Sequence, residues 1–166
     1  AVWEALLSRM PMTAMIRNLA TMTRVGLIAP MADANATVIS RLRDDKRLQK
    51  ARIHPIQVLA ALMTYRAGHG ARSKHTWEPV SQIVDALDGA FYRTFKSVEP
   101  SAKKTLLALD VSGSMECGTI AGVPGLTPRV ASAAMALITA ATERDYTMVA
   151  FTGGGWGTET NPLKDL

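Results

Sequence analysis

Leu106-Leu107-Ala108-Leu109-Asp110-Val111-Ser112-Gly113-Ser114-Met115 is an apolar run that ends in an acid followed by two alternating hydroxyls. Buried strands of parallel sheets are continuous apolar runs, so these residues predict such a strand. Open α/β sheets bind ligands beyond the carboxyl ends of their strands. We therefore expect Asp110, Ser112 and Ser114 to place oxygen atoms in one crevice, and oxygen is the ligand that hard cations such as Mg²⁺ take. The alternative is an ordinary polar turn after a strand.

The residues after this run continue an α/β pattern. A strand over 105–111 is followed by a loop with glycine and proline over 116–128, a helix of small residues over 129–144 and a second strand over 146–152. Strand, helix and strand in this order open a parallel sheet, although two strands do not complete one. Residues 153–166 are predicted to be a loose tail.

The first hundred residues predict short helices instead. Apolar residues recur with helical period before Gly26, which is expected to end the helix. This methionine stripe is more typical of a core than of a binding surface, and it consists of Met12, Met15, Ile16, Leu19 and Met22. Further helices are expected around 38–42, around 48–51, from His54-Pro55 to Gly68, and through 81–95. The predicted N-terminal caps of these helices are Asp44 or Asp45, His54 and Ser81. Short antiparallel helices resemble an α-solenoid of helix pairs, although no repeat of fixed period is seen.

Composition and charge divide the chain in the same way. Its 166 residues are 48% hydrophobic, which is enough for a core, and the single cysteine, Cys117, excludes an internal disulfide. Residues 1–105 hold 16 Lys and Arg against 8 Asp and Glu, whereas residues 106–166 hold 3 against 6. A basic part joined to an acidic part indicates two domains with different partners, and the basic part is the candidate for binding a polyanion.

Several sequence blocks resemble a known family. Met10-Pro11-Met12-Thr13-Ala14-Met15-Ile16-Arg17-Asn18-Leu19 resembles the helical TROVE module. The blocks at 51–55, 64–70 and 90–100, which read ARIHP, TYRAGHG and AFYRTFKSVEP, resemble the Ro autoantigen branch of that family. The D-x-S-x-S pattern of Asp110, Ser112 and Ser114 resembles the metal-ion-dependent adhesion site (MIDAS) of von Willebrand factor A domains.

The resemblance implies a fold and a function. Residues 1–102 are expected to form the last part of an α-helical solenoid of HEAT-like repeats, the TROVE module. Residues 103–166 are expected to form the beginning of a Rossmann-like α/β von Willebrand factor A domain. Ro-family proteins are ribonucleoprotein components: Y RNAs lie on the outside of a helical ring, and 3′ ends of misfolded small RNAs enter its basic hole. We therefore expect an RNA-binding protein of RNA quality control, in the cytoplasm, with neither DNA nor membrane as partner.

The same resemblance implies how the metal is held. In the family the two serines bind the ion directly and the acid acts through water. Complete sites add a threonine and an acid from later loops, and Thr152, Thr158 and Thr160 come too soon to match that threonine. The expected ligands are therefore Asp110, Ser112 and Ser114 alone, with Mg²⁺ as the expected cofactor. The expected role is structural, or the binding of a ribonuclease or other protein partner.

Positively charged side chains are the candidates for phosphate contacts, because Lys and Arg make most of them. Any one of them can equally be an ordinary solvated surface residue. His69, between two glycines, either approaches a phosphate or only ends a helix. Trp77 either stacks on a base or anchors a loop. The predicted RNA contacts are Arg17, Arg24, Lys46, Arg47, Lys50, Arg52, His69, Arg72 and Lys74, with Lys103 and Lys104 as further candidates in the linker.

Two other functions remain open at this point. One is a metal-dependent protein-binding module in which the helices are only a scaffold. The other is a nuclease that uses an ion at Asp110, which requires a further carboxylate. The sequence shows neither a P-loop nor the histidine spacing of a zinc site, and no Ser/His/Asp set is visible. We therefore predict no catalytic residue and no enzyme activity.

Overall fold

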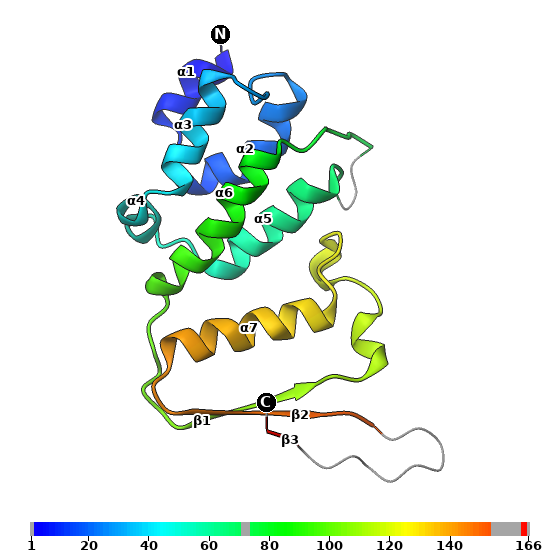
Figure 1. Cartoon of the computed structure of the whole chain (residues 1–166). Coiled ribbons are helices and arrows are strands. Elements are labelled where there is room, and N and C mark those ends of the chain that lie inside the picture. The colour runs from blue at the N-terminus through cyan, green and yellow to red at the C-terminus, as the bar shows by residue number, and fades with distance from the viewer. Residues whose placement is uncertain (1, 71–73, 154–163, 166) are drawn as a thin grey trace. The chain divides into compact units, whose positions relative to one another are not determined.

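The computed structural model describes residues 2–70, 74–153 and 164–165. It divides into two compact units, which are residues 1–98 with 123–125, and residues 99–122 with 126–166. The division after Val98 lies close to the domain boundary predicted after residue 102. Figure 1 shows that the first unit is built from helices and the second from a helix beside a small sheet. None of the helices in the described ranges has the length and apolar character needed to cross a membrane.

The helical unit consists of short helices joined by short turns. The helices expected from the apolar periodicity are present, and α3 begins well before the stretch that predicted it. The structure has α1 Val2–Arg9, α2 Met12–Arg24, α3 Asp33–Leu42, α4 Asp45–Lys50, α5 Pro55–Ala67, α6 Ser81–Arg93 and the 3₁₀ turn η1 Thr94–Ser97.

The methionine stripe of α2 forms part of the core of this unit. All five of its apolar residues are buried, as the helical period predicted. Burying a side chain of this size contributes about 1.5–3 kcal/mol to stability. α2 packs against α5. The core also contains buried side chains of the later helices, among them Leu42, Leu48, Val58, Leu62, Tyr65, Ile83 and Leu87.

Two of the predicted caps are confirmed and one is wrong. The Asp44 carboxylate accepts a hydrogen bond from the Arg47 backbone N–H at 3.1 Å, and His54 Nδ1 accepts one from Ile56 N–H at 3.2 Å. Ser81 does not cap α6, because the N-cap position is occupied by Val80. The Val80 side chain is buried and its N–H donates to the Tyr65 hydroxyl at 3.3 Å, which fixes the start of the helix one residue earlier.

The second unit is the strand–helix–strand element that the sequence predicted. It contains β1 Thr105–Asp110, the turns η2 Gly113–Glu116 and η3 Ile120–Gly122, α7 Pro128–Thr142 and β2 Tyr146–Phe151. β1 and β2 are parallel, in register from Thr105 with Tyr146 to Asp110 with Phe151. The sequence did not predict the short strand β3 Lys164–Asp165, which pairs antiparallel with β2.

Burial of β1 differs from the expectation. The apolar run predicted a strand covered on both faces, but Leu106 is 64% exposed, while Leu107 and Leu109 are half-buried. α7 packs against β1 and accounts for the alternation, because successive strand residues point to opposite faces. The face that carries Leu106 and Ala108 is therefore open within the described residues.

Glu143 holds the segment that leads into β1 of the second unit. Its carboxylate accepts hydrogen bonds from the backbone N–H groups of Ser101 at 2.6 Å and Ala102 at 3.1 Å. The bond from Ser101 lowers the pKa of Glu143 below its ordinary value of 4.5. A carboxyl whose pKa is lower in the folded state stabilises the fold above its unfolded pKa, and this stabilisation is lost as pH falls through the folded value.

We expect Glu143→Gln to lower the melting temperature at pH 7 and to reduce the difference between pH 7 and pH 3.5. The amide retains an acceptor oxygen but no longer carries the charge that makes such bonds strong. Thermal melts followed by circular dichroism across this pH range measure the effect. Glu99→Gln, at an exposed position outside this contact, is the control. An unchanged pH profile in Glu143→Gln contradicts the assignment.

Candidate metal loop and nucleic-acid interface

The metal loop begins where β1 ends. Asp110 is the last residue of β1, and Ser112 and Ser114 lie in the turn that follows. The Ser112 backbone N–H donates to Asp110 Oδ1 at 2.9 Å, and the Oγ atoms of Ser112 and Ser114 are 2.9 Å apart. The structure thus brings the three side chains predicted as metal ligands into one loop.

The donors of this loop fit a magnesium ion. Mg²⁺ binds oxygen at about 2.0–2.1 Å in octahedral geometry, so neighbouring ligand oxygens lie about 2.9 Å apart. The two hydroxyl oxygens are joined by a hydrogen bond of 2.9 Å, and two oxygens at this distance are also close enough to bind one ion. Hydrogen bonds from the backbone N–H and then the side chain of Ser112 lower the pKa of Asp110 from its ordinary value of 3.8. In the described part of the chain, no group of three or more His, Cys, Asp or Glu residues is placed to hold a metal.

Arg129 holds the metal loop from the first turn of α7, a contact that the sequence analysis missed. Its guanidinium forms an ion pair with Glu116 at 2.7 Å and donates to the Ser112 carbonyl oxygen at 3.3 Å. Glu116, the other carboxylate of this loop, is therefore paired with a cation. The only sequence signal is that Arg129 is one of three basic residues in the acidic stretch 106–166.

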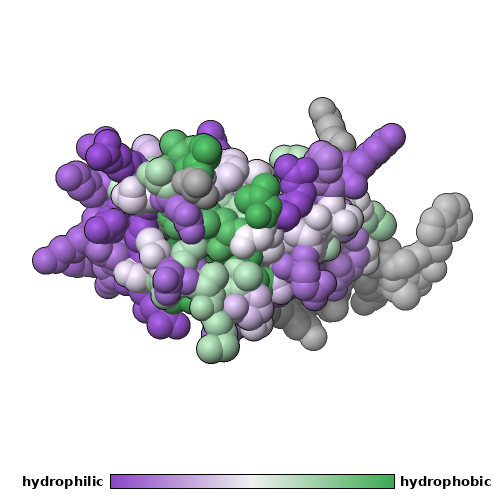
Figure 2. All heavy atoms as spheres, turned by 90° about the horizontal axis from the view of Figure 1, so that it is seen from above, coloured by the Kyte–Doolittle hydropathy of each residue, from purple (hydrophilic) through white to green (hydrophobic). Residues whose placement is uncertain are grey.

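The positively charged candidates of the helical unit are on its surface. Arg17 and Arg24 are exposed on α2, Lys46, Arg47 and Lys50 on α4, and Arg52 directly after α4. Figure 2 shows hydrophilic side chains gathered at the left edge, the side on which α4 lies in Figure 1. His69 and Lys74 are exposed near the turn after α5, and Arg72 lies outside the described residues.

Most of these cations have no partner within the described chain. Arg47 is the exception, because its guanidinium lies 3.1 Å from the Asp44 carboxylate. No ion pair within the described ranges involves the other exposed cations of α2, α4 and the turn after α4. We call these residues the free cations: Arg17, Arg24, Lys46, Lys50 and Arg52. Side chains of this kind are available to phosphates without first breaking an internal contact.

The contacts of the turn after α5 support the interpretation of Trp77 as a loop anchor. The Trp77 indole N–H donates to the Tyr65 carbonyl at 3.0 Å, and its ring stacks on Tyr65 with centroids 6.4 Å apart. Gly68 ends α5 at a φ of 70°, and a Cβ there would lie 2.8 Å from the Trp77 carbonyl oxygen. Trp77 thus anchors this loop, and His69 lies in a tight helix-ending turn.

Comparisons with known proteins agree with both units. The TROVE domain model matches residues 1–64, and the Ro60 vWA domain model matches residues 104–164. The chain belongs to the Ro family. It is 47% identical over 151 residues to a Deinococcus radiodurans protein named RNA-binding protein RO60, and 44% identical over 151 residues to a Caenorhabditis elegans protein of the same name.

A solved Ro structure shares the fold. The crystal structure of the Deinococcus radiodurans RO (RSR) protein matches with a TM-score of 0.85 at 47% identity, covering 90% of this chain and 30% of that one. The chain also covers 28% and 23% of the two curated Ro relatives, and 90% of it is matched in each case. It therefore spans less than a third of the length of these relatives.

Proposed function

We propose that this chain binds small structured RNAs through its helical unit, as part of a Ro ribonucleoprotein. The observation that carries the proposal is the set of free cations, which are exposed on a part of the chain with twice as many basic as acidic residues. Such side chains contact phosphates in any sequence, so the binding is strong at low salt and reads little of the base sequence. The names of the relatives support RNA as the partner.

The finer form of this proposal follows the family resemblance. The helices contribute to a HEAT-like solenoid that closes into a ring, where Y RNAs bind outside and the 3′ ends of misfolded RNAs enter. RNA quality control in the cytoplasm is the corresponding cellular role, with neither DNA nor membrane as a partner. This role requires no catalytic residue in the chain.

A gel-shift titration tests the RNA proposal. A small structured RNA with a single-stranded 3′ tail is titrated at two salt concentrations, with and without Mg²⁺. We expect tight binding that weakens steeply with salt and does not depend on Mg²⁺, because the helical cations and the metal loop are separate sites. The absence of any shift contradicts RNA binding by this chain and favours the protein-binding alternative below.

The alternative is a metal-dependent protein-binding module, which the position of the oxygen-bearing side chains of Asp110, Ser112 and Ser114 in one loop after β1 favours. In this proposal Ser112 and Ser114 would bind Mg²⁺ directly, and Asp110 would act through a water molecule, as the family resemblance implies. A bound ion supplies an open coordination position for an acidic side chain of a partner, such as a ribonuclease. The carboxylate missing for the nuclease hypothesis is not supplied by Glu116, because Arg129 pairs with it.

Arg52 provides a test in which stability and binding change in opposite directions. Arg52 has a φ of 48° and occupies the left-handed position after α4, where glycine is preferred. Its N–H donates to the Gln49 carbonyl at 2.9 Å, and the next N–H, of Ile53, donates to Leu48 at 3.3 Å. These are the two bonds of a Schellman motif. Arginine in this conformation costs about 1 kcal/mol relative to glycine.

We therefore expect Arg52→Gly to raise the melting temperature slightly and to weaken RNA binding several-fold. The glycine removes the strained side chain and, with it, one phosphate contact. Thermal melts and anisotropy titrations of the same preparation measure both effects. Arg52→Lys retains both the charge and the strain, and serves as the control. A glycine variant with full RNA affinity contradicts a role for Arg52 in binding.

A further inference from the structure

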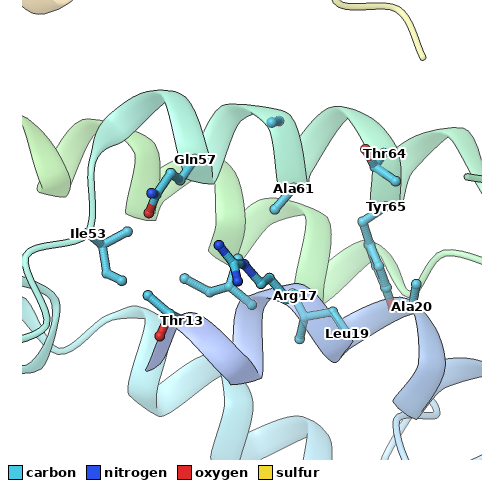
Figure 3. Close-up of a pocket in the computed structure, with 11 residues that line it drawn as sticks. Thr13, Arg17, Leu19, Ala20, Ile53, Gln57, Ala61, Thr64 and Tyr65 are labelled. Atoms are coloured by element: carbon cyan, nitrogen blue, oxygen red, sulfur yellow. The ribbon is translucent and has the colours of Figure 1, made fainter. Parts of the chain in front are cut away.

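A cavity of about 330 Å³ lies between α2 and α5 in the helical unit. Figure 3 shows it between the two helices, with the Arg17 side chain extending into it from α2 and Ala61 facing it from α5. Small-molecule sites have volumes of about 300–1,000 Å³, so this cavity accommodates a small group rather than a folded segment. Apolar side chains line most of it: Ile16, Leu19, Ala20, Ile53, Ala60 and Ala61.

Apart from Tyr65, the polar side chains that line the cavity have no partner in the described chain. They are Thr13, Arg17, Gln57 and Thr64, and neither a hydrogen bond nor an ion pair of their side chains is found within the described residues. The guanidinium supplies donors only, the amide supplies both donors and an acceptor, and the hydroxyls supply either. None of the lining residues is acidic. The cavity therefore favours a ligand that joins an apolar planar body to an anionic group.

The floor of the cavity is held in place by contacts on its far side. Tyr65 is 1% exposed, and its hydroxyl is bonded to Thr23 at 2.8 Å and to the Val80 N–H at 3.3 Å. Ile53 is also buried, at the end of the Schellman motif. The alanines on α2 and α5 leave the space between these fixed walls. A preformed site of this kind requires little ordering when a ligand binds.

We propose that this cavity receives one unstacked nucleobase of a single-stranded RNA, with the Arg17 guanidinium holding the adjacent phosphate. The inference rests on the RNA-binding function proposed above and adds a specific site to it. The apolar walls suit the faces of a base, and Gln57 offers both a donor and an acceptor to its edge. Proteins commonly bind single-stranded RNA through unstacked bases of this kind.

The test compares two fluorescent oligomers of ten units, oligouridylate and its abasic ribose-phosphate counterpart, by anisotropy with the full chain. We expect the wild type to bind oligouridylate about tenfold more tightly than the abasic oligomer, because only the former inserts a base. Ala61→Leu, which fills the cavity, and Gln57→Ala, at an exposed position, should each reduce this ratio toward one. Arg17→Gln should weaken binding of both oligomers. Arg66→Gln, an exposed arginine of α5 that does not line the cavity, should change neither.

The outcomes separate this proposal from the general one. If the wild type, Ala61→Leu and Gln57→Ala each bind both oligomers with equal affinity, the proposed nucleobase site is wrong. RNA binding by the helical unit is then still supported. Binding of neither oligomer by the wild type overturns both proposals. If added uridine monophosphate removes the preference of the wild type for oligouridylate over the abasic oligomer, the nucleobase site is supported. If the monophosphate binds and the oligomers bind without base dependence, the cavity takes a free nucleotide and its assignment to a base of RNA is wrong.

Discussion

Reversing the charges of Arg17, Arg24, Lys50 and Arg52 together to Glu is expected to raise the Kd for a small structured RNA about a thousandfold at low salt. Each substitution removes a phosphate contact and adds a repulsion, at a cost of about 1 kcal/mol or more per site. The salt dependence should become shallower by about three in the slope of log K against log salt, since four single-strand contacts contribute about 0.7 each. Anisotropy titrations at several salt concentrations measure both quantities.

The structure indicates that this variant folds. All four side chains are exposed, and none forms an ion pair within the described residues. Surface changes of this kind usually alter stability by about 0.5 kcal/mol or less. The matched control exchanges lysine and arginine at the same positions, R17K, R24K, K50R and R52K, and should bind nearly as the wild type does. If the charge-reversed variant binds RNA normally, this face is not the interface.

The parts of the fold set by local sequence were predictable. The helical period of the methionine stripe predicted the buried face of α2, and Asp44 and His54 predicted two helix starts. The apolar run before Asp110 predicted β1, and the second apolar run predicted its parallel partner β2. The buried helix face, the caps and the strand runs depend on residues within a few positions of one another, where periodicity and capping act. The parallel pairing of β1 with β2 is long-range, and it was predicted from the order strand, helix, strand. The HEAT-like solenoid stays a prediction, because short helices alone do not establish a repeat.

The parts set by distant contacts were not predictable. The start of α6 depends on a hydrogen bond between Val80 and Tyr65, which no pattern near Ser81 indicates. The ion pair of Arg129 with Glu116 spans a loop, and the cavity between α2 and α5 combines residues some forty positions apart. Exposure of Leu106 depends on which helices cover the sheet, rather than on the strand itself. The sequence identified residue types for the metal loop and the interface, but not their partners.

Asp110→Ala is expected to abolish the stabilisation of the second unit by Mg²⁺ and to leave RNA affinity nearly unchanged. A ligand that binds only the folded state at about a hundred times its Kd adds about 2.7 kcal/mol, and the variant loses this increment. The alanine removes both the negative charge and the acceptor of the Ser112 N–H. Thermal melts with and without 10 mM Mg²⁺, together with RNA titrations, measure the two effects. If the protein-binding alternative is correct, the same variant loses its protein partner.

Two further substitutions show which property of Asp110 matters. Asp110→Asn retains an oxygen acceptor for the Ser112 N–H but loses the charge that strengthens this bond, so without Mg²⁺ it should melt slightly below the wild type. It should gain no further stability when Mg²⁺ is added. Glu116→Gln disrupts the ion pair with Arg129 and leaves the three proposed ligands in place, so it should still be stabilised by Mg²⁺. Equal stabilisation of the wild type and Asp110→Ala contradicts a metal site at this loop. A loss of RNA affinity in Asp110→Ala contradicts the separation of the two sites, since it makes the metal loop part of the RNA interface.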